Sequence, residues 1–260
     1  MTIQTGSVPT APPVLVWLRK LGDAAVDLLF PPRCVICHRL GAWLCAACIE
    51  EIEFIQPPVC THCGLPLETS IPNPGTRTLC DRCQHTPSAL DAQRSLAYHG
   101  GPLRAAIHEF KYRDLRSLAV PLARLMAARW ATLAPCPDFG TIVPVPLHPR
   151  RQRERGYNQA ALLARELGTC FAKPVDEGVL VRTRATAPQV GLSPVDRQHN
   201  VQGAFRCTSD DLSGMHVLLV DDVCTTGSTL ESACLALREA GVTSVQAYTL
   251  ARAKPSGLEP

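Results

Sequence analysis

The stretch that most constrains the fold runs from Val217 to Leu230 and reads VLLVDDVCTTGSTL. Its four leading apolar residues predict a strand buried on both faces in a parallel sheet. An acidic pair, Asp221 and Asp222, comes next, followed by small hydroxyl-bearing residues around one glycine. A helical apolar pattern closes the stretch, and Ser228 with Glu231 predicts a capping box at its start. Strand, tight loop and helix N-terminus together form a geometry that binds anions.

The acidic pair is unusual in a loop built for phosphate, because two negative charges repel an anion. The carboxylates must therefore meet something that tolerates them, and both sugar hydroxyls and a divalent cation qualify. A ligand with a ribose at the strand end and a phosphate at the helix start satisfies the whole stretch. A P-loop is excluded because no Gly-Lys-Ser/Thr is present, and a receiver domain needs more chain after its acids. The alternative without a ligand is an ordinary strand–turn–helix unit whose two acids lie on the surface.

Cysteine pairs mark the N-terminal third of the chain. Eight of the thirteen cysteines form four C-x-x-C pairs, and two such pairs close one tetrahedral zinc site. The simplest pairing is sequential, and it groups Cys34, Cys37, Cys45 and Cys48 in one site and Cys60, Cys63, Cys80 and Cys83 in a second. An interleaved pairing, a single occupied site, and ligands from His38, His62 or His85 stay open. Disulfides and a redox function fit these pairs less well.

Length and composition set limits on the protein class. The 260 residues, nearly half of them apolar, suffice for one large domain and a small module. The formal net charge is only +3, so bulk charge does not indicate a nucleic-acid partner. No apolar run is long enough for a membrane span, and the N-terminus lacks the pattern of a signal peptide. We therefore expect a cytoplasmic protein, whose reduced thiols favour zinc over disulfides.

The expected elements divide the chain into three parts. Residues 1–13 are expected to form a disordered tail, and residues 14–88 an amphipathic helix (14–30) followed by the cysteine module. Residues 89–254 alternate strands with helices, which predicts an α/β fold with a parallel sheet. The expected strands are 91–99, 141–146, 179–184, the strand that begins at Val217, and 244–252. The expected helices are 103–112, 118–133, 158–167 and 231–240.

A second chemical landmark follows the strand 141–146 and reads PLHPRRQRERGYNQ. Arginine binds polyphosphate oxygens through two parallel hydrogen bonds and stays charged. His148, Arg150 and Arg151 are therefore candidates for binding a pyrophosphate group. The alternatives are a solvated basic loop or a nucleic-acid patch that also includes Arg153 and Arg155.

A long polar segment at 186–204 carries turn-forming residues and no clear periodicity. A segment of this length inside a compact domain is either functional or a mistaken assignment. The functional interpretation is a mobile lid that keeps water from a reactive sugar carbon, with Gln189, Arg197 and Asn200 on it.

Five segments together resemble the ComF family, and the resemblance covers nearly the whole chain from Cys34 to Arg252. They are the cysteine module, FKYR at 110–113, VPVPLHPRRQRERGYNQA, the PQVGLS…R..NV.GAF segment and VLLVDDVCTTGSTL. The last segment also resembles the 5-phosphoribosyl-1-pyrophosphate (PRPP) motif of type I phosphoribosyltransferases. The resemblance implies a type I phosphoribosyltransferase fold, a parallel sheet flanked by helices, with a small N-terminal double zinc-ribbon module.

The resemblance also implies roles for residues of the stretch from Val217 to Leu230. Asp221 and Asp222 are expected to contact the ribose hydroxyls and to serve catalysis. The 5-phosphate is expected to lie on Thr225, Thr226, Gly227, Ser228 and Thr229. The implied chemistry is attack of an amine or nucleobase on C1 of Mg²⁺-bound PRPP with loss of pyrophosphate. Structural Zn²⁺, one or two ions, is the other expected cofactor.

The family is linked to natural competence and DNA uptake in some bacteria. Single-stranded DNA and competence proteins are therefore further candidate partners. A non-catalytic PRPP sensor or single-stranded-DNA-binding protein is the alternative to an enzyme. The acceptor, a general base and the oligomeric state are not visible in the sequence.

Overall fold

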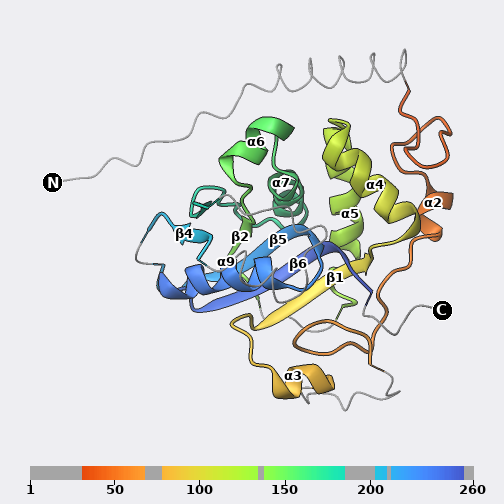
Figure 1. Ribbon diagram of the computed structural model, residues 1–260. Helices are drawn as coiled ribbons and strands as arrows, with labels where there is room; N and C mark the ends of the chain where they lie inside the picture. Colours follow the sequence, from red (N-terminus) through yellow and green to blue (C-terminus); the bar gives the residue numbers. More distant parts are fainter. Residues whose placement is uncertain (1–30, 68–77, 134–137, 185–202, 210–211, 255–260) are drawn as a thin grey trace.

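A four-stranded parallel sheet forms the centre of the structure, a computed structural model that describes residues 31–67, 78–133, 138–184, 203–209 and 212–254 (Figure 1). The strand order is β1–β6–β5–β2, and every neighbouring pair is parallel. The strands are β1 (Ala92–Tyr98), β2 (Thr141–Pro144), β5 (His216–Cys224) and β6 (Ser244–Arg252). A separate antiparallel pair consists of β3 (Leu180–Arg182) and β4 (Phe205–Cys207). The parallel sheet predicted from the sequence is confirmed.

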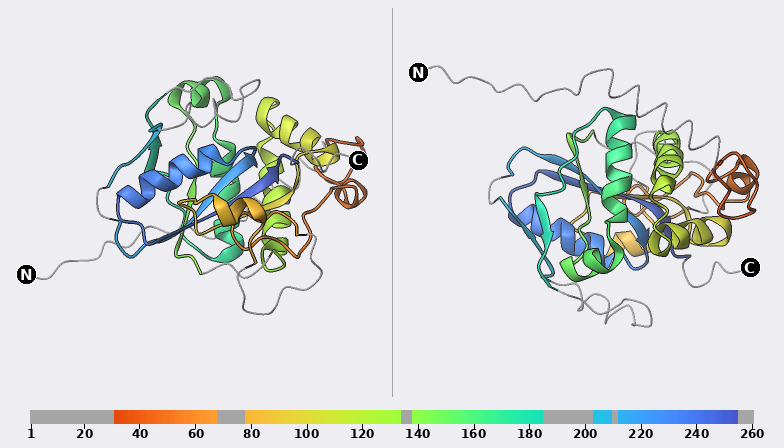
Figure 2. Two further views of the ribbon diagram at one scale, coloured as in Figure 1. Left: turned by 60° about the horizontal axis from the view of Figure 1, so that its bottom comes forward. Right: turned by 90° about the horizontal axis from the view of Figure 1, so that it is seen from above.

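Helices cover both faces of this sheet. The helices are α2 (Ala46–Glu50), α3 (Asp81–His85), α4 (Gly101–Tyr112), α5 (Ala119–Trp130), α6 (Pro149–Arg155), α7 (Gln159–Phe171) and α9 (Ser228–Glu239). One core holds the buried residues of α4, α5 and α7, and a second core holds those of α9. Figures 1 and 2 show α9 lying across the sheet from α5 and α7.

The central strand β5 is buried on both faces, as its apolar run predicts. Leu218 and Val220 join the core beneath α5 and α7, whereas Val217 and Leu219 join the core beneath α9. All four side chains are almost fully buried. The strand continues through the acidic pair to Cys224, so both carboxylates belong to the last residues of a strand and not to a loop.

The cysteine module covers the edge strand β1. Phe54 forms an antiparallel bridge with Ala97, and the Ile55 N–H donates to the Leu96 carbonyl oxygen at 3.1 Å. This cover explains why every residue of β1 is buried although the strand is polar. Arg94 is 1% exposed, and its guanidinium donates to main-chain carbonyl oxygens of Thr61 and of the segment after α5. Sheet and module therefore share polar contacts as well as a core.

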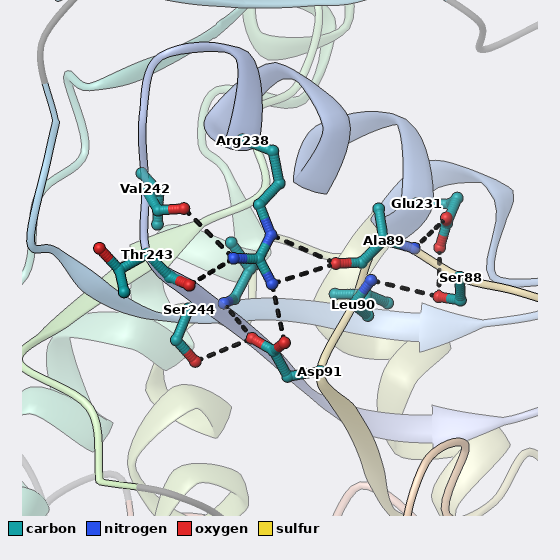
Figure 3. A network of polar contacts seen from close by, with 10 residues as sticks. Ser88, Ala89, Leu90, Asp91, Glu231, Arg238, Val242, Thr243 and Ser244 are labelled. Atoms are coloured by element: carbon teal, nitrogen blue, oxygen red, sulfur yellow. Dashed lines mark hydrogen bonds and ion pairs between the residues drawn. The ribbon is translucent and has the colours of Figure 1, made fainter.

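A polar network ties the start of the sheet domain to α9 (Figure 3). The carboxylate of Asp91 accepts hydrogen bonds from Arg238 and Ser244, each at 2.8 Å. Glu231 accepts from the Ser88 hydroxyl at 2.7 Å and from the Ala89 N–H at 2.6 Å. These contacts hold α9, the helix behind the phosphate motif, against the linker from the cysteine module.

The same network shows that the predicted capping box is wrong. Gly227, which has no side chain, is the N-cap of α9, and Ser228 is already helical. Glu231 does not reach back to the helix start, because its carboxylate binds the linker instead.

The predicted loop after β2 also differs from the structure, because most of it is the short helix α6. His148 is its N-cap, with Nδ1 accepting from the Arg150 N–H at 3.2 Å, and Pro149 occupies the first helical position. Proline is well suited to that position because its missing N–H would have no helical partner.

Several predictions fall outside the described residues. These are the tail 1–13, the helix 14–30 and the lid residues Gln189, Arg197 and Asn200. Among the residues that are described, the search for a helix of membrane-spanning length and hydrophobicity finds none.

Candidate functional site

The phosphate motif forms a tight turn between β5 and α9. Gly227 has φ +86°, a left-handed conformation that glycine adopts without steric cost. The Thr226 hydroxyl lies 2.7 Å from the Ser228 hydroxyl and accepts from the Ser228 N–H at 3.3 Å. A small pocket opens here, lined by Asp221, Val223, Cys224, Thr225, Gly227, Ser228, Thr229 and Leu230. The predicted phosphate residues thus surround the positive end of a twelve-residue helix.

The acidic pair lies beside this turn with both side chains half-buried. The Asp222 N–H donates to Oδ1 of Asp221 at 2.8 Å. Burial and the neighbouring charge of Asp222 raise the pKa of Asp221 to about 7. The Asp221 carboxyl therefore exchanges its proton close to neutral pH.

A lysine meets the acidic pair from α4. The ammonium of Lys111 lies 2.8 Å from Oδ1 of Asp222, and the two side chains are 19% and 13% exposed. The sequence predicted no role for Lys111, although this residue belongs to the FKYR segment that carries part of the family resemblance. A further signal in the sequence was its position near the C-terminal end of the helix that follows β1, next to the apolar residue Phe110.

Basic side chains approach the same acids from the β2 edge of the sheet, opposite the β1 edge from which Lys111 comes. Arg182 on β3 has its pKa lowered by burial and by the charge of Arg151 on α6, while Asp221 opposes this shift. These three groups are therefore electrostatic neighbours. Of the predicted pyrophosphate residues, Arg151 is close enough for its charge to act on Arg182, whereas the Arg150 guanidinium pairs with Glu154 at 2.9 Å on an exposed surface.

His99 is a further titratable group at the carboxyl end of the sheet, directly after β1. Its pKa is lowered by burial first and then by the charges of Lys111 and Arg104, and the charge of Asp222 opposes the change. The imidazole is consequently neutral at pH 7 and has a nitrogen that accepts hydrogen bonds or protons. The signal for His99 in the sequence was a polar, titratable residue at the end of a buried strand.

The eight cysteines of the module form two sets. Cys34, Cys37, Cys45 and Cys48 make the first set, and Cys60, Cys63, Cys80 and Cys83 make the second. Within each set all four sulfur atoms lie within 4.8 Å of one another, and the described residues add no histidine to either. The structure therefore brings the cysteines together in the sequential order.

The spacing of the thiols suits zinc. The Cys37 and Cys45 sulfur atoms are 3.5 Å apart, and those of Cys63 and Cys80 are 3.7 Å apart. Tetrahedral zinc with bonds of about 2.3 Å needs sulfur atoms about 3.8 Å apart. The hydrogen bond from Cys63 lowers the pKa of Cys60 to about 4, which favours the thiolate, the form that binds metal.

One polar residue, Gln93, links the second cysteine set to the phosphate turn through its backbone and its side chain. The Gln93 N–H donates to the His62 carbonyl oxygen at 2.6 Å, between Cys60 and Cys63. Its side-chain amide donates to the Cys224 sulfur at 2.9 Å. A Cβ on Gly227 would lie 3.7 Å from Oε1 of Gln93. Cys224, to which sequence analysis gave no chemistry, is thus a packing residue beneath the turn.

Two family models match the chain. Residues 25–86 match a double zinc ribbon domain, and residues 154–260 match a phosphoribosyl transferase domain. Together with the geometry, these matches show a type I phosphoribosyltransferase fold that carries an N-terminal double zinc ribbon, and the two cysteine sets support structural zinc.

Named relatives match most of the chain. DNA utilization protein YhgH of Salmonella typhi is 34% identical over 235 residues, which are 86% of this chain and 99% of that protein. Competence protein F of Haemophilus influenzae is 33% identical and covers 85% of this chain and 97% of its own length. Competence protein ComFC of Bacillus subtilis is 25% identical, with coverages of 80% and 84%.

Proposed function

This chain belongs to the ComF family, and from that premise we propose that it binds PRPP and transfers the phosphoribosyl group to an amine or a nucleobase. The observation that carries the proposal is the junction of β5 and α9, where two acids and a hydroxyl-rich turn lie side by side. Carboxylates accept hydrogen bonds from sugar hydroxyls, and a helix N-terminus binds a phosphate. A sugar phosphate is the ligand class that uses both.

The ribose end of the ligand is assigned to Asp221 and Asp222. Both carboxylates leave a rigid strand, so little conformational entropy is lost when a ligand binds. The 5-phosphate is assigned to the turn from Thr225 to Thr229, where backbone N–H groups and hydroxyls surround a small pocket. The acids also stabilise positive charge that develops on the sugar when its C1–oxygen bond breaks.

The pyrophosphate end is assigned to Arg151 and Arg182, because the charge of Arg151 acts on Arg182 and Arg182 in turn interacts with Asp221. Mg²⁺ prefers oxygen ligands and usually binds through one or two carboxylates together with substrate phosphates. The Asp221 and Asp222 carboxylates provide such oxygens beside the phosphate turn, so the residues fit this ion. When bound, Mg²⁺ supplies further positive charge to the pyrophosphate.

In the proposed reaction, the acceptor nitrogen forms a bond to C1 of the sugar. The bond from C1 to the pyrophosphate oxygen breaks, and its electron pair leaves with pyrophosphate. The acceptor nitrogen loses one proton, and the neutral imidazole of His99 is a proton acceptor at the same edge of the sheet. Reducing conditions keep the eight module thiols available to zinc, so we place the reaction in the cytoplasm.

Calorimetry with PRPP and Mg²⁺ tests the binding step, and pyrophosphate release in the presence of nucleobases and amines tests the transfer. The double variant Asp221→Asn with Asp222→Asn is expected to lose at least tenfold in PRPP affinity, because neutral amides are weaker acceptors for sugar hydroxyls. Native protein that binds no PRPP contradicts the proposal. Tight binding without pyrophosphate release identifies a PRPP sensor instead of an enzyme.

A second candidate function, binding of single-stranded DNA alongside competence proteins, is favoured by one surface feature. Tyr112 is 64% exposed, and its ring lies 5.1 Å from the His108 ring and 5.2 Å from the Arg155 guanidinium carbon. An exposed aromatic ring among basic side chains suits a stacked base and its phosphate. Fluorescence anisotropy with labelled oligothymidine tests this function: Tyr112→Ala is expected to weaken binding, and the affinity is expected to fall as salt rises.

A further inference from the structure

Lys111 is held firmly in place at the end of α4. Its neighbour Phe110 is fully buried in the core, and the Tyr157 hydroxyl donates a hydrogen bond to the Phe110 carbonyl oxygen. The backbone at this end of α4 is thus fixed from two sides. The Lys111 ammonium, 2.8 Å from Oδ1 of Asp222, is consequently held in a fixed position beside the acidic pair.

The shielding of this ion pair sets it apart from other lysine pairs of the described residues. Lys173 pairs with Asp138 at 3.3 Å, but the Asp138 side chain is 88% exposed. Lys254 pairs with Glu53 at 2.8 Å, and that carboxylate is 55% exposed. Asp222 is only 13% exposed. Exposed pairs are screened by water and salt, whereas a shielded pair keeps more of its Coulomb attraction.

A charge conflict in the site gives this shielded pair a function. PRPP carries a phosphate, assigned to the turn, and a pyrophosphate, assigned to the arginines, and both groups must bind near the two carboxylates. Asp221 and Asp222 are adjacent on one strand and repel any polyanion that binds beside them. Lys111 offsets the charge of one acid while leaving the second oxygen of Asp222 able to accept a sugar hydroxyl.

We propose that Lys111 is an affinity-determining residue of the sugar-phosphate site, where it offsets the charge of Asp222 so that a polyanionic ligand binds beside the acidic pair. This inference rests on the proposed PRPP site and adds to it a residue from a distant helix. It also gives the FKYR segment a physical role. Lys111 acts through Asp222, so it is a positioning and charge-compensating residue, not a catalytic one.

The test compares PRPP affinities of three variants by calorimetry at fixed Mg²⁺. Lys111→Met is expected to raise the Kd at least tenfold, and Lys111→Arg, which keeps the charge, to raise it less than threefold. Lys173→Met is the matched control, because it removes a lysine ion pair that lies before β2, at the opposite edge of the sheet. Its affinity is expected to stay within twofold of the native value. Thermal unfolding of each variant establishes that it is folded.

Salt and a double variant separate charge compensation from a purely structural role. The ratio of Lys111→Met to native Kd is expected to fall as sodium chloride rises, because salt screens the repulsion. In an Asp222→Asn background, Lys111→Met is expected to change the Kd less than threefold, since the charge that it offsets is gone. An equal loss in both backgrounds, or a salt-independent ratio, overturns the inference.

Failure of the inference is distinct from failure of the proposed function. If native protein binds PRPP and Lys111→Met binds it equally well, the role of Lys111 is wrong and the proposed function stands. If native protein binds no PRPP at any Mg²⁺ concentration, the proposed function is wrong, and the inference about Lys111 is wrong with it.

Discussion

The guanidinium of Arg252 donates a 2.7 Å hydrogen bond from Nη1 to the carbonyl oxygen of Cys63. Arg252 lies at the end of β6, directly opposite Cys224 of β5, and is only 6% exposed. One buried side chain therefore connects the second cysteine set with the strand that carries the acidic pair. Gln93 forms a parallel connection from His62 to Cys224.

Loss of zinc from the second set is expected to weaken PRPP binding more than loss from the first. Cys83→Ser removes one ligand from the second set, and Cys37→Ser is the matched change in the first. Each variant is expected to lose about one zinc ion per chain by metal analysis. Only Cys83→Ser is expected to raise the Kd for PRPP, by roughly tenfold, because its set contacts Gln93 and Arg252.

Arg252→Met provides the control for this coupling. It keeps all eight thiols, and both zinc ions are expected to remain by metal analysis. If Arg252 transmits the effect, the variant shows weakened PRPP binding with a full zinc content. Equal affinities in Cys83→Ser and Cys37→Ser would contradict the coupling.

Asp221→Asn is expected to stabilise the ligand-free protein at pH 8. The pKa of this carboxyl is about 7 in the fold and 3.8 in the unfolded chain. The stability that its protonated form contributes is complete below pH 3.8, falls as pH rises, and is lost above pH 7. The shift corresponds to at most about 4 kcal/mol, and access of solvent to a half-buried group reduces this to about 1–3 kcal/mol. Asparagine does not ionise and avoids that loss.

Urea unfolding between pH 5.5 and 8.5 measures this effect. The stability gain of Asp221→Asn is expected to grow with pH, while its PRPP affinity falls. Asp91→Asn serves as the contrast, because Asp91 accepts hydrogen bonds from Arg238, Ser244 and the Val245 N–H. That variant is expected to be less stable than native protein at every pH. A pH-independent gain for Asp221→Asn would disprove the assigned cause.

Gly227→Ala is expected to reduce PRPP affinity through the backbone alone. A Cβ there meets Gln93 and Cys224 at ordinary contact distances of 3.7 and 3.9 Å, so no clash arises. The φ of +86° still costs an alanine about 1–2 kcal/mol. Gly214→Ala is the matched control, with φ +77° and open space around the new Cβ.

Both glycine variants are expected to lose similar stability in urea unfolding. Only Gly227→Ala is expected to weaken PRPP binding, by roughly tenfold, because the strain sits in the turn that holds the 5-phosphate. Equal affinities in the two variants would show that the turn does not bind the ligand.

Patterns within one element predicted much of this molecule. The run from Val217 to Val220 predicted a strand buried on both faces, and the two cores confirm it. The signal was strong because burial on both faces leaves no polar alternation in the sequence. The C-x-x-C pairs likewise predicted zinc sets, because each pair brings its two ligands with it.

Contacts between distant elements were not predictable in the same way. The Lys111–Asp222 pair depends on how α4 lies over the end of β5, which no local period encodes. Glu231 matched a capping box, but a linker 142 residues away in sequence competed for its carboxylate. Gln93 and Arg94 are buried polar residues of an edge strand, and their partners come from the cysteine module, the segment after α5 and β5. In each case the tertiary structure decided what the side chain does.

Arg151 and Arg150 are adjacent in sequence, and we expect them to differ in function. Arg151 influences Arg182 beside Asp221, whereas the Arg150 side chain is 76% exposed and pairs with Glu154. Arg151→Ala is expected to weaken binding of PRPP and of free pyrophosphate about tenfold, since a partly desolvated arginine–phosphate pair contributes more than an exposed one. Arg150→Ala is expected to change either affinity less than twofold. Ribose 5-phosphate, which lacks the pyrophosphate, is expected to bind all three proteins alike in calorimetry. If Arg151→Ala weakens ribose 5-phosphate as much as PRPP, Arg151 serves the sugar end or the fold, and the pyrophosphate group lies elsewhere.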